Sequence, residues 1–105
     1  VQDGGTFTNE GTVSTEAGGK VALYSENGIF TNTSDGTISA KNGGIAMFVK
    51  DSKGTVAGKI NVGDSANGNT GIGVYLDAAS SKTVTFSGAE LKLGKGTVGL
   101  YKRKF

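Results

Sequence analysis

A four-residue hydrophobic pattern occurs four times in the chain. Each copy has a β-branched residue, then Ala or Gly, then a large apolar residue, and finally an aromatic residue. The copies are Val21–Tyr24, Ile45–Phe48, Ile72–Tyr75 and Val98–Tyr101. Their aromatic residues are separated by 24, 27 and 26 residues. A regular period of this size is typical of solenoids, propellers and other repeat architectures.

Two shorter stretches with alternating polar and apolar residues precede each copy. The nearer ones are 12–15, 37–40, 59–62 and 90–93, and the weaker, more distant ones are 6–9, 29–32, 55–57 and 83–86. Alternation with a period of two is typical of a half-buried strand. It places Val13, Ile38, Ile60 and Leu91 on the inward face.

Three short strands in each repeat of about 26 residues predict one coil of a parallel β-helix. We therefore predict an all-β solenoid of about four coils, with essentially no α-helix, in a single segment covering residues 1–105. The coils are expected at about 5–28, 29–54, 55–82 and 83–105. An antiparallel sandwich would also have short strands and Gly-rich turns, but it gives no reason for one motif to recur at one interval.

The composition agrees with many turns and a thin core. The chain has 19 Gly among 105 residues, and 35% of its residues are hydrophobic. Three of the nearer strands follow Gly11, Gly36 and Gly58, and the fourth follows Ala89. This predicts a bend with little room for a side chain or with a positive φ. Asn9 and Asn32 end identical Phe-Thr-Asn segments, which predicts a short ladder of hydrogen-bonded asparagines at a corner.

The charge and the missing residue types narrow the chemistry. The chain has no Cys and no His, so it lacks thiolate ligands, disulfides and the commonest general base. A net charge of +2, with both signs interleaved, does not favour nucleic-acid binding. No stretch has the apolar length of a membrane-spanning helix, so we expect no membrane insertion by this segment. No leader opens the chain, and we expect the segment to be part of a longer array.

Segments 44–48, 58–64, 70–75 and 96–101 resemble the repeats of bacterial type V autotransporter passengers, most closely the large fusobacterial outer-membrane adhesins. The resemblance implies a secreted passenger displayed at the bacterial cell surface, with anchoring supplied by sequence outside this chain. It also implies adhesion to host cells or other bacteria through a protein or glycan receptor. The adjoining coils of the same polypeptide would be the other partners. Because the matching residues are those of the scaffold, they do not identify the ligand.

The aromatic residues of the motif are the first candidate binding site. If the first and third motif residues point inward, then Tyr24, Phe48, Tyr75 and Tyr101 form a ladder on the outer face, beside Ala22, Ala46, Gly73 and Gly99. Aromatic faces over small residues can stack on sugars or contact a protein. The structural alternative is that these rings only cover the edge of each coil or pack beneath a loop.

The connection of the third repeat is the second candidate. It has nine residues, 63–71, where the other repeats have four or five, and projecting loops often carry recognition. Asp64, Asn67 and Asn69 are its candidate contact residues, with a solvated loop as the structural alternative and calcium binding disfavoured because only one carboxylate is present. We predict no metal site, cofactor or catalytic residue.

Other functional classes remain alternatives to adhesion. A polysaccharide lyase or hydrolase fragment would need clustered acids, whereas Asp35, Asp51, Asp64 and Asp77 fall at different positions in their repeats. A pure spacer stalk would neither bind nor catalyse.

Overall fold

Strands are the only regular secondary structure in the described residues of the computed structural model. The structure describes residues 3–16, 18, 20–66, 68–77 and 84–103, with Lys102 and Arg103 described by their backbone only. The strands are β1 Thr6–Asn9, β2 Thr12–Thr15, β3 Val21–Glu26, β4 Ile29–Asn32, β5 Thr37–Ala40, β6 Ile45–Lys50, β7 Lys53–Val56, β8 Lys59–Val62, β9 Ile72–Asp77, β10 Val84–Phe86, β11 Glu90–Leu93 and β12 Val98–Arg103.

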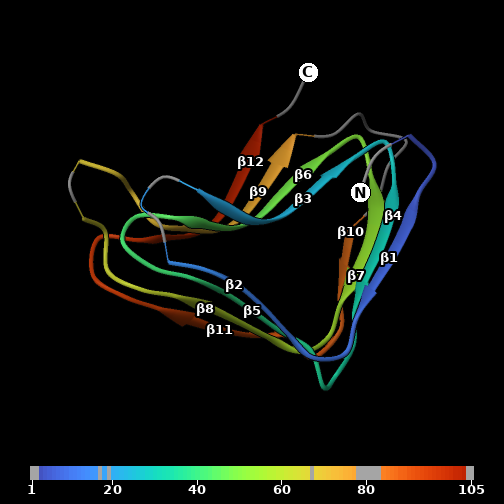
Figure 1. Cartoon of the computed structure of the whole chain (residues 1–105), viewed down its shortest axis with the longest axis horizontal. Helices are drawn as coiled ribbons and strands as arrows, with labels where there is room; N and C mark the ends of the chain where they lie inside the picture. Colours follow the sequence, from blue (N-terminus) through green and yellow to red (C-terminus); the bar gives the residue numbers. More distant parts are fainter. Residues whose placement is uncertain (1–2, 17, 19, 67, 78–83, 104–105) are drawn as a thin grey trace.

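The twelve strands form three parallel four-stranded sheets around one axis (Figure 1). The strand orders are β1-β4-β7-β10, β11-β8-β5-β2 and β12-β9-β6-β3, which we call sheets B, C and A. Each strand pairs in parallel with its equivalent one repeat away. This confirms the predicted parallel β-helix. We call β1–β3 coil 1, β4–β6 coil 2, β7–β9 coil 3 and β10–β12 coil 4.

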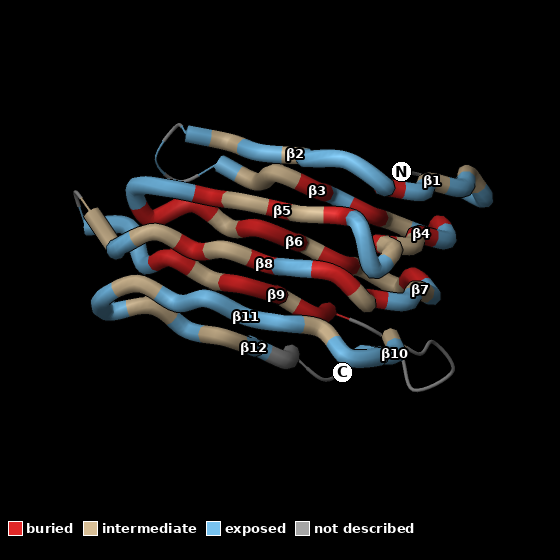
Figure 2. The backbone as a smooth tube through the Cα atoms, turned by 90° about the horizontal axis from the view of Figure 1, so that it is seen from below, coloured by how far each residue is buried: buried red, intermediate tan, exposed pale blue. Residues whose placement is uncertain are grey.

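The register stacks equivalent residues into columns that form the core. In sheet C, Val13, Ile38, Ile60 and Leu91 make one column, as the alternation predicts. Ile38 and Ile60 are fully buried, whereas Leu91 is 37% exposed. Figure 2 shows the same trend along the solenoid, with buried residues concentrated in the middle coils. Burial therefore depends on having a coil on both sides.

One strand lies further toward the N-terminus than the sequence indicates. We predict a strand at 55–57, but β7 covers Lys53–Val56 and starts with a Lys and a Gly. The ring of Phe30 in β4 occupies the place where a Cβ on Gly54 would lie. Phe30 is fully buried, so Gly54 is needed to let the ring fill the core.

The predicted asparagine ladder is confirmed at the corner between sheets B and C. Nδ2 of Asn9 donates to Oδ1 of Asn32 at 2.9 Å, and Nδ2 of Asn32 donates to the carbonyl of Gly36 at 3.2 Å. Both asparagines are buried. Val56 occupies the equivalent position in coil 3 and ends the ladder. Because each buried amide has partners, the corner is stabilised and not left with unpaired polar atoms.

The small residues before the sheet C strands are explained by crowding. None of Gly11, Gly36 and Gly58 has a positive φ, so that alternative is wrong. A Cβ on Gly58 would contact the carbonyl oxygens of Gly36 and Thr33, whereas one on Gly11 would meet nothing within 4 Å. The corner backbones are therefore too close for a side chain at Gly36 and Gly58, which pack on the preceding coil, while Ala89 of coil 4 packs its side chain against the core.

Nothing in the described part of the chain forms a helix with the length and apolarity needed to cross a bilayer.

Candidate functional site

The four aromatic residues of the motif form a continuous stacked ladder on the outside of sheet A. The ring centroids of Tyr24 and Phe48 lie 5.2 Å apart, those of Phe48 and Tyr75 4.6 Å, and those of Tyr75 and Tyr101 4.8 Å. The planes of successive rings differ by 9°, 7° and 21°. Tyr24 and Tyr101, at the two ends, are the most exposed rings. The predicted ladder is therefore present, and its four residues lie within the strands of sheet A.

The small residues of the motif do not flank this ladder, which corrects the expected face assignment. Ala46 is fully buried, and a Cβ on Gly73 or Gly99 would point toward the side chain of Leu91 across the core. The register pairs the first, third and fourth residues of each motif and omits the second. A bend like a β-bulge, shared by all four strands, thus turns the second and third residues inward together.

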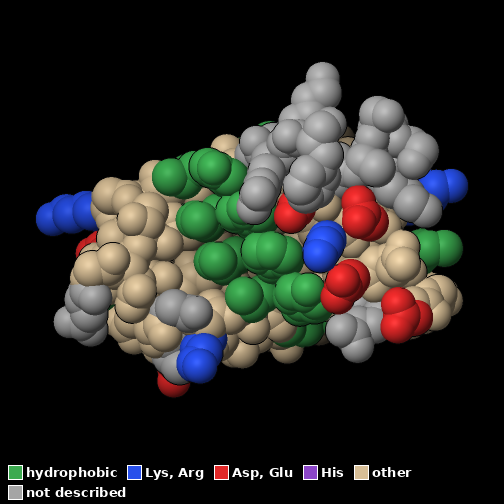
Figure 3. All heavy atoms as spheres, turned by 90° about the horizontal axis from the view of Figure 1, so that it is seen from above, with side chains coloured by type: hydrophobic (Ala, Val, Ile, Leu, Met, Phe, Trp, Pro, Cys, Tyr) green, Lys and Arg blue, Asp and Glu red, His purple; other side chains and the backbone are tan. Residues whose placement is uncertain are grey.

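As a consequence, the first motif residue joins the outer face. Val21, Ile45 and Ile72 are half-buried and are not among the residues packed against the core, whereas Ala22 is. Figure 3 shows hydrophobic side chains gathered over sheet A on this face. We call the two columns together the ladder face; its members are Val21, Ile45, Ile72, Val98, Tyr24, Phe48, Tyr75 and Tyr101.

A charged column borders the ladder face on the C-terminal side of the strands. The register aligns Glu26, Lys50, Asp77 and Arg103, so the signs of charge alternate along the column. Nζ of Lys50 lies 3.7 Å from Oε2 of Glu26. The Tyr24 hydroxyl donates to Oε1 of Glu26 at 3.2 Å. Partial burial in the ladder raises the pKa of Tyr24 above its usual value. The negative charge of Glu26 and its hydrogen bond with the Tyr24 hydroxyl raise this pKa further.

The long connection of coil 3 folds back onto its neighbours. Oδ1 of Asp64 accepts from the backbone N–H of Lys95 at 2.7 Å, so the carboxylate caps the turn of coil 4. Asn69 pairs with Ala66 through two backbone hydrogen bonds, and its backbone leaves no room for a Cβ on Gly43 of coil 2. The third candidate, Asn67, lies outside the described residues. Asp64 thus has a structural role, while Asn69 is exposed at the corner.

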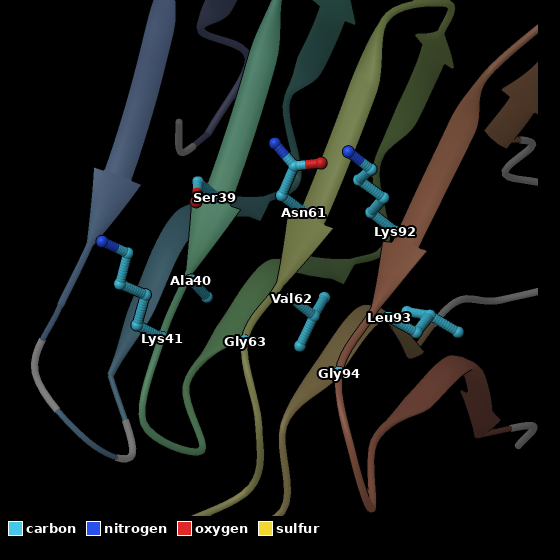
Figure 4. A pocket seen from close by; sticks show the side chains of 9 residues that line it. All are labelled: Ser39, Ala40, Lys41, Asn61, Val62, Gly63, Lys92, Leu93 and Gly94. Atoms are coloured by element: carbon cyan, nitrogen blue, oxygen red, sulfur yellow. The ribbon is translucent and has the colours of Figure 1, made fainter.

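A hollow of ≈ 550 Å³ lies over sheet C near the ends of its strands (Figure 4). Ser39, Asn61 and Lys92 stand in register on one side of the strands, with Ala40, Val62 and Leu93 on the other. Lys41 borders the hollow and forms an exposed ion pair with Glu16 at 3.2 Å. Gly63 and Gly94, which follow β8 and β11, also line the hollow.

The acidic residues are not arranged as a metal centre in the part of the chain that the structure describes, because no three His, Cys, Asp or Glu side chains come together there.

Asp77 is buried, and among the described residues its Oδ1 has no hydrogen-bond partner. Its place in the charged column was not evident from the sequence, since the column depends on strands that extend two residues beyond each aromatic.

The fold and the ladder define a parallel β-solenoid with a regular aromatic face. No family model matches the chain, and comparison with curated proteins and with solved structures finds no match either.

Proposed function

We propose that this solenoid is a passenger segment of a bacterial surface adhesin of the type V autotransporter class, and that its ladder face contacts a receptor on host cells or other bacteria. The proposal places the segment outside the cell, anchored at the outer membrane through sequence outside this chain. The observation that carries it is the partly exposed outer face of sheet A, on which an aromatic column and an aliphatic column lie side by side. The motif's resemblance to passenger repeats supports the same assignment.

The geometry of the ladder favours a protein receptor over a stacked sugar. Rings about 5 Å apart and nearly parallel cover one another's faces, so Phe48 and Tyr75 offer only their edges to a partner. A sugar normally packs against the face of a ring, and here only the two end rings have an outward face. Edges of aromatic rings beside an aliphatic column instead suit apolar and hydroxyl contacts with a protein surface.

Binding of the fluorescently labelled chain to host cells and to bacteria, measured by flow cytometry over a concentration series, tests this proposal. The Tyr75→Ala/Tyr101→Ala variant is expected to weaken saturable binding by about tenfold or more, because aromatic contacts at an interface centre carry much of the free energy. Ile29→Ala is the matched control, since Ile29 is an exposed hydrophobic residue on sheet B.

Circular dichroism of each variant must show the same strand content as the original chain. If the folded double variant binds as tightly as the control, the ladder is structural and the adhesive role of this face is wrong. If the original chain shows no saturable binding to any cell type, the segment acts as a spacer.

A further inference from the structure

The outer face of sheet C carries a row of polar side chains that the fold leaves without partners. Ser39, Asn61 and Lys92 stand in register on adjacent strands and line the hollow of ≈ 550 Å³. Among the described residues, none of these three side chains has a hydrogen-bond or ion-pair partner. The asparagines of the corner ladder, in contrast, are hydrogen-bonded. The row therefore has donors and acceptors available for a ligand.

The floor of the hollow beside this row is mostly bare backbone (Figure 4). Lys41, Gly63 and Gly94 are the equivalent residues that follow β5, β8 and β11, and each donates its backbone N–H to a carbonyl of the preceding coil at 2.8–3.1 Å. Only Lys41 has a side chain, and its amino group is paired with Glu16. Because small-molecule pockets measure roughly 300–1,000 Å³, this hollow has room for a ring and not only for an ion.

Lys92 is the charge at the hollow that the fold leaves uncompensated. Lys59 and Glu90, which start β8 and β11, are neighbours of opposite charge in register on the same face of sheet C. The register neighbour of Lys92 is the neutral Asn61. Figure 4 shows the amino group of Lys92 and the amide of Asn61 extending toward each other. One cation beside one neutral amide favours a ligand that carries a single negative charge.

The backbone N–H groups around the hollow are already used, which disfavours a phosphate. Those of Gly63 and Gly94 donate to carbonyls, and that of Lys95 is held by the Asp64 carboxylate at 2.7 Å. A phosphate is normally bound by several N–H groups or by Arg, and here it would find neither. The negative charge of Asp64 at the same end also repels a multiply charged ligand. The hollow therefore suits a carboxylate better than a phosphate.

We propose that the hollow binds an acidic sugar unit of a glycan, a uronate. Its carboxylate lies at Lys92, its hydroxyls contact Asn61 and Ser39, and its ring lies over the backbone of Gly63 and Gly94. Sugar hydroxyls both donate and accept hydrogen bonds, as do the amide of Asn61 and the hydroxyl of Ser39. The bond between the amino group and the carboxylate is charge-assisted and supplies most of the affinity. Because the site lies on sheet C, this inference does not rest on the adhesive role proposed for the ladder face of sheet A.

Titration of the full 105-residue chain with methyl glucuronide, followed by amide NMR spectroscopy, tests the proposal. The amide signals of Asn61, Gly63 and Gly94 are expected to shift saturably, with a dissociation constant on the order of 1 mM. Methyl glucoside has a hydroxymethyl group in place of the carboxylate, and acetate has the carboxylate without the ring. Each of these two ligands is expected to bind at least about tenfold more weakly than methyl glucuronide. This comparison of ligands needs no variant of the protein.

Lys92→Met removes the charge and keeps the aliphatic chain, so it should reduce the affinity for methyl glucuronide to that for methyl glucoside. Lys59→Met is the matched control, since Lys59 is exposed on the same face but does not line the hollow, and it should change the affinity less than about twofold. The amide spectrum of each variant reports whether the fold persists. The proposal is wrong if methyl glucuronide causes no saturable shift, if methyl glucoside or acetate binds as tightly, or if Lys92→Met binds like the original chain.

Discussion

The two middle coils bury the apolar columns of the core, whereas the two end coils bury them only in part. In sheet C, Ile38 and Ile60 are fully buried, while Val13 is half-buried and Leu91 is exposed in the same column. The residues are similar, so the difference comes from stacking on one side in place of two. In this solenoid a residue's contribution to stability therefore depends on its coil more than on its type.

The largest expected effect is a core truncation in a middle coil. Ile60→Ala removes a fully buried side chain and should lower the free energy of unfolding by about 2–5 kcal/mol. Leu91→Ala, in register with Ile60, should cost about 1 kcal/mol because water already reaches Leu91. Urea unfolding followed by circular dichroism measures both changes. Equal losses would mean that coil 4 is covered in solution or that the columns do not contribute separately.

A second pair of variants probes the corners. Gly58→Ala places a methyl group against the carbonyls of Gly36 and Thr33, and it should cost up to about 3 kcal/mol. Gly11→Ala, at the same corner of coil 1, meets open space and has no positive φ to accommodate. Gly11→Ala should be neutral or should stabilise the protein by up to about 1 kcal/mol, because Ala lowers the conformational entropy of the unfolded chain. Thermal unfolding of the two variants distinguishes them, and a destabilised Gly11→Ala would show that crowding is not the cause.

The sequence predicts most of this fold because the fold is periodic. The recurring motif and the alternation of residues such as Ile38 and Ile60 are local signals, and a parallel solenoid only stacks them. The sequence prediction missed the start of β7 because Lys53 and Gly54 have low strand propensity, whereas Gly54 is required by the ring of Phe30 in the preceding coil. Such a requirement is set by packing between repeats, which no single repeat reveals.

The ladder of the candidate site follows from the sequence, but its surroundings do not. Strict alternation placed Ala46 outside, whereas the shared bend turns it inward and brings Ile45 to the outer face. The signal that could have indicated this is that only Ala or Gly occupies the second motif position, which indicates a tight contact. The charged column and the hollow over sheet C depend on exact register, so they emerge only from the structure.

The asparagine ladder gives a third comparison between a middle and an end coil. Asn32→Ala removes two buried hydrogen bonds, one to the carbonyl of Gly36 and one from the amide of Asn9, and should cost about 2 kcal/mol. Each of these groups keeps one other partner, since Gly36 also accepts from the Lys59 N–H and Asn9 also donates to the carbonyl of Thr37. Asn9→Ala should cost about half as much, because water can enter from the coil 1 end and solvate Asn32. A double-mutant cycle monitored by urea unfolding yields their coupling energy. If Asn9→Ala costs more than Asn32→Ala, the coil 1 end is closed to water.

The smallest expected effects are those of the surface ion pairs that join coil 1 to coil 2. Lys50 and Glu26 are partly shielded beside the ladder, with side chains 40% and 34% exposed, whereas Lys41 and Glu16 are 59% and 76% exposed. Removing the charge with Lys50→Met should cost less than about 1 kcal/mol, and Lys41→Met should change nothing measurable.

Hydrogen exchange of the β3 amides, read at low and at high salt, is the sensitive measurement, because the end coil opens before the core. The Lys50→Met effect should shrink as salt screens the pair, since the charges remain accessible to water. An effect of the same size at both salt concentrations would mean that the attraction between Lys50 and Glu26 is not what holds coil 1 in place.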